Sequence, residues 1–142
     1  MTSTGCPVDG ARAMVIDTSA LLAILLNEPE RRGFNEQIAG AATRLMSSAS
    51  FLETAIVIET RKGDSGARDL DLFLHQAAIE VVGVDHNQAQ IARRAWRSYG
   101  KGNHPARLNF GDCFVYALAK ASGEPLLFKG KDFSQTDLTL CV

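Results

Sequence analysis

Residues 14–26 read MVIDTSALLAILL, and this stretch decides the fold class. Its first three residues form a short apolar run, which favours a strand buried inside a sheet. The run ends at Asp17, and Thr18 and Ser19 are residue types that begin helices by capping free backbone N–H groups. Leucines then recur at helical spacing. The stretch therefore predicts a strand, an acid at its carboxyl end, and a helix that follows at once.

The same alternation of strands and helices continues along the chain. Apolar runs predict further strands over residues 44–47, 80–84, 125–128 and 138–141. Capping residues and glycine stop signals predict helices over residues 29–40, 51–61, 67–78, 88–99 and 111–121. Strands separated by helices form parallel sheets with helices on both faces. We therefore expect an α/β fold of this kind.

The chain has 142 residues, of which 46% are hydrophobic and 22% charged. This length predicts one domain with a real core, and the composition excludes disordered, collagen-like and coiled-coil proteins. Thr, Ser, Gly, Pro and Asp dominate residues 1–13, which show no periodicity. We expect a flexible N-terminal tail over residues 1–13 and a single domain over residues 14–142.

The net charge of −1 excludes a uniformly basic binder of polyanions, although it leaves room for a local basic surface. No apolar stretch approaches the roughly 20 residues that a membrane-spanning helix needs. Residues 14–26 come nearest, but Asp17 interrupts them and no clear signal-peptide cleavage site follows. We expect a cytoplasmic protein that makes no membrane contact.

Two acidic residues in the first half of the chain are poorly explained by packing. Asp17 ends the first strand, where parallel sheets collect functional groups, but it is also placed to cap the next helix. Glu53 shares a helical stripe with Ile56 and Val57, so its charge would lose solvation unless it were paired or metal-bound. Its alternative role is a favourable interaction with the helix dipole. A catalytic and a structural interpretation stay open for each.

Two further acids stand in the second half. With Asn109 as an N-cap, Asp112 falls in the first turn of a helix whose other residues are small and apolar, where it either serves chemistry or interacts with the helix dipole. Asp132 lies in the loop after residues 125–128, where a turn residue is the structural alternative.

Together, the four acids stand near strand ends or helix starts of one predicted sheet. Carboxylate oxygens suit hard divalent cations such as Mg²⁺ or Mn²⁺, which activate water and clamp phosphate oxygens. The three histidines and three cysteines are not spaced as zinc ligands. The acids therefore point to a metal-dependent reaction at a phosphate.

Four strings of sequence, taken in order, resemble the PIN-domain nucleases, and most closely the VapC toxins of bacterial toxin–antitoxin modules. They are MVIDTSALL at 14–22, SFLET at 50–54, NFGDCFVYALA at 109–119 and PLLFKGKDF at 125–133. The resemblance covers nearly all of the chain from residue 14 onward. It implies a three-layer α/β/α sandwich around a parallel sheet and a metal-dependent endoribonuclease that hydrolyses RNA phosphodiester bonds with Mg²⁺ or Mn²⁺.

The resemblance also implies roles for individual residues. It places Asp17, Glu53 and Asp112 among the metal-binding and catalytic acids, with Ser19 supporting the first of them. Glu53 is our candidate for the base that deprotonates the attacking water. The wider family often carries an acid two places before the Asp-Phe pair, where this chain has Gly130. Asp132 is therefore expected as the fourth catalytic acid, unless the site works with three.

Protein partners follow from the same resemblance. It implies a VapB-like antitoxin that covers the acidic site, and it implies a homodimer. Residues 21–26 and 27–40 are the candidate contact surfaces for the antitoxin, although an apolar pattern alone does not separate such a surface from the core.

Residues 86–111 contain no acid but carry five cations, with Trp96 and Tyr99 among them. Basic groups beside aromatic rings suit a phosphate track with base stacking, whereas the alternative is a solvated helix face with Trp96 in the core. The five cations are Arg93, Arg94, Arg97, Lys101 and Arg107. Our candidate RNA-binding residues are Arg93, Arg94, Arg97, Lys101, Lys129 and Lys131.

Other functions share some of these features. Phosphatases of the haloacid dehalogenase type need an acid two places after Asp17, where this chain has Ser19, and response-regulator receivers need paired acids that we do not find. A catalytically inactive PIN-like interaction domain and a structure-specific DNA nuclease stay open as alternatives. The complete trio of acids argues against the first, and a flap-type DNA nuclease would want a longer chain with more acids.

Overall fold

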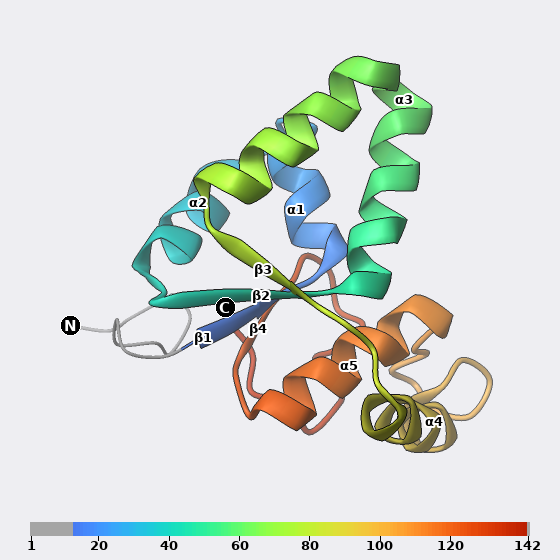
Figure 1. Cartoon of the computed structure of the whole chain (residues 1–142). Helices are drawn as coiled ribbons and strands as arrows, with labels where there is room; N and C mark the ends of the chain where they lie inside the picture. The colour runs from blue at the N-terminus through green and yellow to red at the C-terminus, as the bar shows by residue number, and fades with distance from the viewer. Residues whose placement is uncertain (1–12, 142) are drawn as a thin grey trace.

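A four-stranded parallel sheet lies at the centre of the molecule, and the computed structural model describes residues 13–141 around it (Figure 1). The strands are β1 (Ala13–Ile16), β2 (Thr43–Ser47), β3 (Ile79–Val82) and β4 (Leu126–Leu127). They lie in the order β3-β2-β1-β4, and every pairing is parallel. The predicted tail falls outside the described residues except for Ala13, which begins β1.

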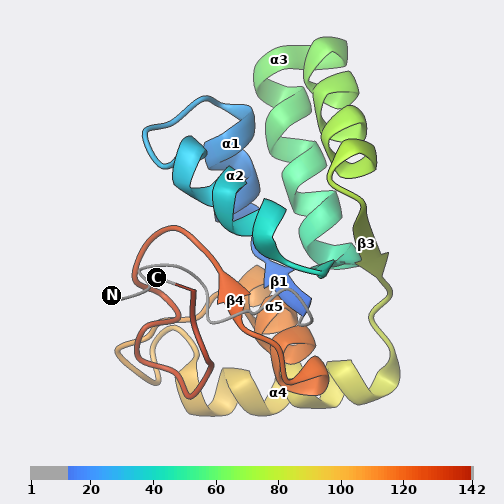
Figure 2. The ribbon, with the colours of Figure 1, turned by 90° about the vertical axis from the view of Figure 1, so that its left-hand side faces the viewer.

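Five helices cover the two faces of this sheet within the described residues. They are α1 (Thr18–Leu25), α2 (Arg31–Gly40), α3 (Ser48–Gln76), α4 (His86–Tyr99) and α5 (Phe110–Ser122). The first three lie on one face, and α4 and α5 lie on the other (Figures 1 and 2). The predicted three-layer α/β/α arrangement is confirmed.

The alternation of side chains along β1 explains why both faces are covered. Met14 and Ile16 are fully buried in the core with α1 and α3, whereas Val15 is fully buried in the core with α4 and α5. Successive residues of a strand point to opposite faces, so an apolar strand needs a helical layer on each side. This is the buried strand that the apolar run predicts.

Three details bear on the sequence expectations. Asp17 is the N-cap of α1, which confirms its alternative capping role, whereas Thr18 and Ser19, the other candidate caps, lie in the first turn of the helix. The two helices expected on either side of Gly63 are present, and they meet within α3 at a kink where Gly63 has a non-helical backbone with a positive φ of 59°. The strand expected over residues 138–141 is wrong, because only Leu140 pairs with the sheet, in a single bridge to Leu126.

The topology brings distant segments to one edge of the sheet. Strands β1, β2 and β4 are parallel neighbours, so their carboxyl ends point the same way. Asp17 follows β1, α3 with Glu53 follows β2, and the loop with Asp132 follows β4.

None of the helices within residues 13–141 combines the length and hydrophobicity needed to cross a bilayer.

Candidate active site

Asp17 is the most buried acid at this edge, with only 7% of its surface exposed. Its Oδ2 accepts hydrogen bonds from the Ser19 backbone N–H at 3.0 Å and from the Ser19 hydroxyl at 2.5 Å. Burial raises the pKa of Asp17 above its ordinary value, although the Ser19 donors favour the charged form, and the nearby Glu53 charge raises it further. The carboxylate is therefore held in place at a cost in solvation.

Ser19 links Asp17 to the loop that follows β4. Its hydroxyl donates to Asp17 and accepts a 2.8 Å hydrogen bond from the backbone N–H of Lys129. The Lys129 ammonium pairs with Glu28 at 2.7 Å and with Glu30 at 3.4 Å. These contacts tie the loop carrying Asp132 to both ends of α1. Lys129, which the sequence suggests as an RNA contact, is therefore already engaged in two ion pairs.

Glu53 is exposed, contrary to the burial that the sequence pattern suggested. Its stripe on α3, which includes Ile56 at 58% exposure, faces outward. The core side of α3 instead carries Ser50, Thr54 and Ile58. A helical stripe shows which residues share a face but not which face is covered. The desolvation argument for Glu53 was therefore wrong, although its proximity to Asp17 is clear from the hydrogen bonds around it.

Two buried threonines connect Glu53 to the first acid. The Thr18 hydroxyl lies 3.3 Å from Glu53 Oε1 and 3.1 Å from the Ser50 carbonyl, and it accepts a 3.2 Å hydrogen bond from Thr54. Thr54 is fully buried, and its hydroxyl also lies 2.8 Å from the Ser50 carbonyl. Sequence reasoning missed both residues. A usable signal was present, because a threonine directly follows each of the acids Asp17 and Glu53.

Gly111 lets α5 approach Glu53 closely. A methyl group placed on Gly111 would lie 3.0 Å from Glu53 Oε1 and 3.5 Å from its Oε2. The N-terminus of α5, with Asp112 as its next residue, therefore lies against the carboxylate of Glu53.

Asp112 forms a capping box with Asn109 at the start of α5. Its backbone N–H donates to Asn109 Oδ1 at 2.9 Å, and its own Oδ2 accepts from the Asn109 backbone N–H at 3.0 Å. Burial raises the pKa of Asp112 to about 7, and the charges of Asp17, Asp132 and Glu53 also contribute. Asp112 thus helps to cap α5 and is also repelled by the charges of the other three acids.

The structure brings all four predicted acids into electrostatic contact. Asp132 lies exposed on the loop after β4, near enough to Asp112 to disfavour its ionisation. Across residues 13–141, no group of three or more His, Cys, Asp or Glu side chains is arranged so that it could hold a metal ion. The donor set still fits a hard divalent cation, because it consists of carboxylate oxygens whose repulsion such a cation relieves.

The predicted RNA-binding cations separate into different surroundings. Lys101 and Lys131, 30 residues apart, line one polar hollow beside Asp132, whereas Arg94 lies on another surface with Tyr116 and Lys120. The candidate RNA-binding residues therefore do not all lie on one surface. Arg93 and Arg97 are exposed on α4.

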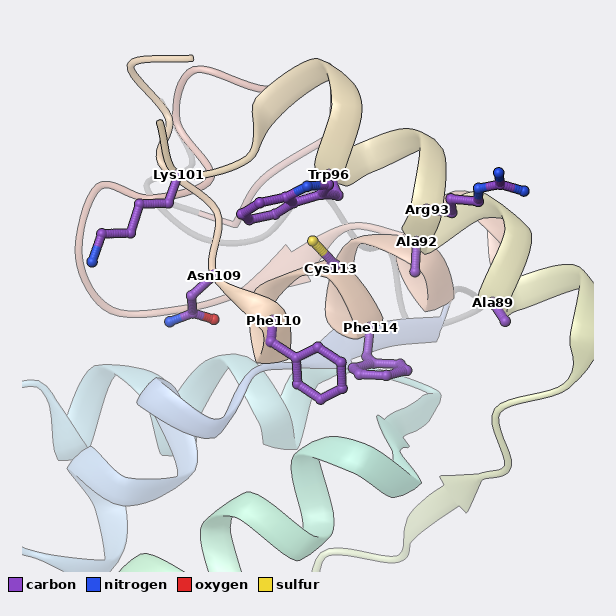
Figure 3. A pocket seen from close by; sticks show the side chains of 9 residues that line it. All are labelled: Ala89, Ala92, Arg93, Trp96, Lys101, Asn109, Phe110, Cys113 and Phe114. Carbon is purple, nitrogen blue, oxygen red and sulfur yellow. The ribbon is translucent and has the colours of Figure 1, made fainter. Parts of the chain in front are cut away.

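An apolar pocket of about 590 Å³ lies between α4 and α5 (Figure 3). Trp96 and Cys113 lie within it, Phe110 and Phe114 lie along its lower side, and Arg93 and Lys101 stand at opposite ends. Trp96 is 44% exposed rather than a core residue. The rings of Phe110 and Phe114 meet edge to face at 4.8 Å.

Comparison with known proteins finds one family model along most of the chain. The model is described as the PIN domain, and it matches residues 14–138. The match includes the four acids at the edge of the sheet, and it spans the described structure from β1 to the segment after β4.

Curated relatives match over nearly their full length. Ribonuclease VapC30 of Mycobacterium tuberculosis is 58% identical over 125 residues, which are 88% of this chain and 95% of the relative. Ribonuclease VapC of Mycolicibacterium smegmatis is 59% identical over 125 residues, which are 88% of this chain and 97% of the relative.

Solved structures share the fold at low sequence identity. VapBC2 of Rickettsia felis, bound to a DNA fragment of its promoter, gives a TM-score of 0.74 at 15% identity and covers 90% of this chain and 96% of that chain. VapC20 of Mycobacterium tuberculosis, described as a toxin that cleaves the sarcin–ricin loop, gives 0.71 at 19% identity, with 89% and 96% covered.

Proposed function

Because the chain belongs to the PIN-domain family, and within it to the VapC ribonucleases, we propose that it is the toxin of a toxin–antitoxin pair and hydrolyses RNA with a divalent cation. One observation carries the catalytic part of this proposal. Four carboxylates from separate segments gather at one edge of the sheet, where burial first of all, and then the charges of the other three acids, raise the pKa of Asp112 to about 7. Perturbed acids of this kind concentrate at functional sites.

Asp17, Glu53 and Asp112 would hold Mg²⁺ or Mn²⁺, with Asp132 as a fourth acid. When bound, such a cation activates water and neutralises charge that develops on the phosphate. Ser19 and Thr18 keep the first two carboxylates oriented through the hydrogen bonds described above. The Asp17 and Glu53 carboxylates would therefore be oriented before RNA arrives.

Glu53 is suited to receive a proton. Its Oε1 is held by Thr18, whereas its Oε2 has no hydrogen-bond partner among residues 13–141. The water oxygen attacks phosphorus, the bond from phosphorus to the leaving oxygen breaks, the proton of the water passes to Glu53 Oε2, and the leaving oxygen takes up a proton from solvent. An exposed base also allows the proton to return to solvent after each turnover.

The proposed protein partner is a VapB-like antitoxin, because related structures include VapBC complexes. Of the predicted contact surfaces, Leu21 and Ile38 are buried and belong to the core. Leu22, Leu25 and Phe34 are only partly buried. We place the antitoxin contact on these partly exposed side chains of α1 and α2.

We propose the homodimer contact on the apolar surface beside the active site. Phe110 is 79% exposed, and Leu52 and Ile56 on α3 are each 58% exposed. Large exposed apolar patches mark interfaces. Phe110→Ser is therefore expected to convert a dimer into a monomer, as measured by light scattering. If the variant is still a dimer, the contact lies on another surface.

The test of the catalytic proposal is cleavage of total RNA with Mg²⁺, with Mn²⁺ and with a chelator. We expect cleavage by the wild type with metal only, and none by Asp17→Asn, whose amide oxygen still caps α1. Asp85→Asn is the matched control, because Asp85 caps α4 in the same way, accepting from the Gln88 N–H at 2.8 Å.

Each failure of this test has its own meaning. Cleavage that persists in Asp17→Asn or in the chelator would contradict the proposed site. Cutting of single-stranded or branched DNA but not RNA would make the protein a DNA nuclease. Absence of any cutting, with the protein folded and metal present, would support an inactive interaction domain.

A further inference from the structure

A second hollow lies beside the acids, lined by residues of the α4–α5 connection and of the loop after β4. Figure 2 shows the course of these two segments. It measures about 300 Å³, within the size range of ligand clefts. Lys101 and Arg107 line it from one side and Lys131 from the other. These two segments are distant in sequence, so the hollow exists only in the folded chain.

The three cations of this hollow differ from other cations of the molecule. Lys101, Arg107 and Lys131 have no ion pair or side-chain hydrogen bond within the part of the chain that the structure describes. By contrast, Lys129 pairs with Glu28 and Glu30, and Arg44 donates to three backbone carbonyls. The cations that face the hollow are thus available to an external anion.

The backbone holds Arg107 firmly in this position. Two hydrogen bonds close the connection at its base, from the Lys101 N–H to the Leu108 carbonyl and from the Leu108 N–H to the Tyr99 carbonyl. Arg107 itself has a φ of +57°, in the left-handed region that non-glycine residues seldom adopt. Such local strain clusters at functional sites and persists where surrounding contacts impose it.

The opposite wall is also fixed. Phe133 is buried and its ring packs on Phe128 at 5.4 Å, which anchors the loop that carries Lys131. Asp132 and Asn109 line the same hollow. Asn109 caps the helix of Asp112, so the hollow directly adjoins the acidic edge.

We infer that this hollow, which we call the cationic hollow, binds the phosphodiester of the nucleotide next to the scissile bond. The inference rests on the proposed ribonuclease function and names a subsite for its substrate. Three cations against one carboxylate attract an anion, and Arg107 offers a planar fork that matches phosphate oxygens. An RNA backbone that passes from the acids to the hollow would therefore be held on both sides of Asn109.

The first test measures RNA binding and cleavage with glutamine variants. Affinity for a fluorescein-labelled single-stranded RNA in Ca²⁺ is expected to fall roughly tenfold in Arg107→Gln, with smaller losses in Lys101→Gln and Lys131→Gln. The salt slope should fall by about 0.7, as for one lost phosphate contact on a single strand, and kcat/KM for RNA cleavage should fall together with the affinity. Arg68→Gln is the control, because Arg68 is exposed on α3, away from the hollow.

The second test assigns the contact to one phosphate. A single uncharged methylphosphonate is moved along an RNA that the wild type cleaves, and one position beside the cleaved bond should weaken wild-type binding as much as Arg107→Gln does. The two changes should not add, because they remove the same contact. Two results would overturn the assignment of phosphate binding to the cationic hollow and leave the proposed function intact. They are full additivity, or unchanged affinity in Arg107→Gln while the wild type still cleaves RNA. A wild type that neither binds nor cleaves RNA would overturn the proposed function with it.

Discussion

The acidic edge and the cationic hollow lie side by side but are built in opposite ways. Asp17 and Asp112 are held by backbone or hydroxyl donors, and their pKa values are raised. Lys101 and Lys131 are exposed and lack ion pairs within residues 13–141. Holding the acids in place therefore lowers the stability of the fold. The exposed cations stay solvated and lower it little. Changes in the two regions should have different signatures.

The largest expected effect is that of Asp112→Asn. Loss of the carboxylate should reduce RNA cleavage by roughly a hundredfold or more, since a metal ligand is worth several kcal/mol. The same change removes repulsion from Asp17, Asp132 and Glu53, and asparagine can still accept the Asn109 N–H. The metal-free variant should therefore melt at a higher temperature than the wild type. A lower melting temperature together with full RNA cleavage would contradict the different roles given to the acidic edge and the cationic hollow.

The next effect concerns the buried threonines. Thr18→Val removes the hydroxyl that contacts Glu53, and Thr54→Val removes the hydroxyl that holds Thr18. We expect a loss of roughly tenfold or more in Mn²⁺ affinity, measured by calorimetry. Thr18→Ser should restore most of it.

Thr60→Val is the control for this prediction. Thr60 makes the same bond to the carbonyl four residues back, 2.6 Å from Ile56, but on the exposed side of α3. Equal Mn²⁺ affinity in Thr54→Val and Thr60→Val would show that the threonines do not orient the site.

A smaller and selective effect is expected from Gly111→Ala. The added methyl would stand 3.0 Å from Glu53 Oε1, and the exposed Glu53 side chain would have to move away. Alanine is the better helix former by roughly 0.5–1 kcal/mol. We therefore expect metal affinity to fall a few-fold while the melting temperature is kept or raised. A parallel loss of both would indicate general damage to α5.

The smallest effect is a dependence of stability on pH in the absence of metal. The pKa of Asp112 is about 7 in the folded protein and 3.8 ordinarily, so between these values the folded chain binds the extra proton. Its unfolding free energy should therefore fall as pH rises toward about 7. Melting curves at pH 5 and pH 8 in a chelator should show this trend, and it should weaken in Asp112→Asn. An unchanged trend in that variant would assign it to other groups.

Local signals predicted the parts of the site that depend on neighbouring residues. The apolar run before Asp17 and the Asn109 cap before Asp112 are read from a few consecutive positions, and both elements lie where expected. The exposure of Glu53 was not predictable in this way, because it depends on which side of α3 the sheet covers. Lys101 and Lys131 line the same hollow only because two loops that are far apart in the sequence lie next to each other in the fold. No periodicity records such a contact.

The central claim is that carboxylates from separate segments form one cation site. The most direct measurement is anomalous diffraction from crystals of the wild-type protein soaked in Mn²⁺. The account predicts a peak at the edge of the sheet, bound by the carboxylates of Asp17, Asp112 and Glu53. Ordered Mn²⁺ elsewhere, or none at a concentration that supports RNA cleavage, would contradict it.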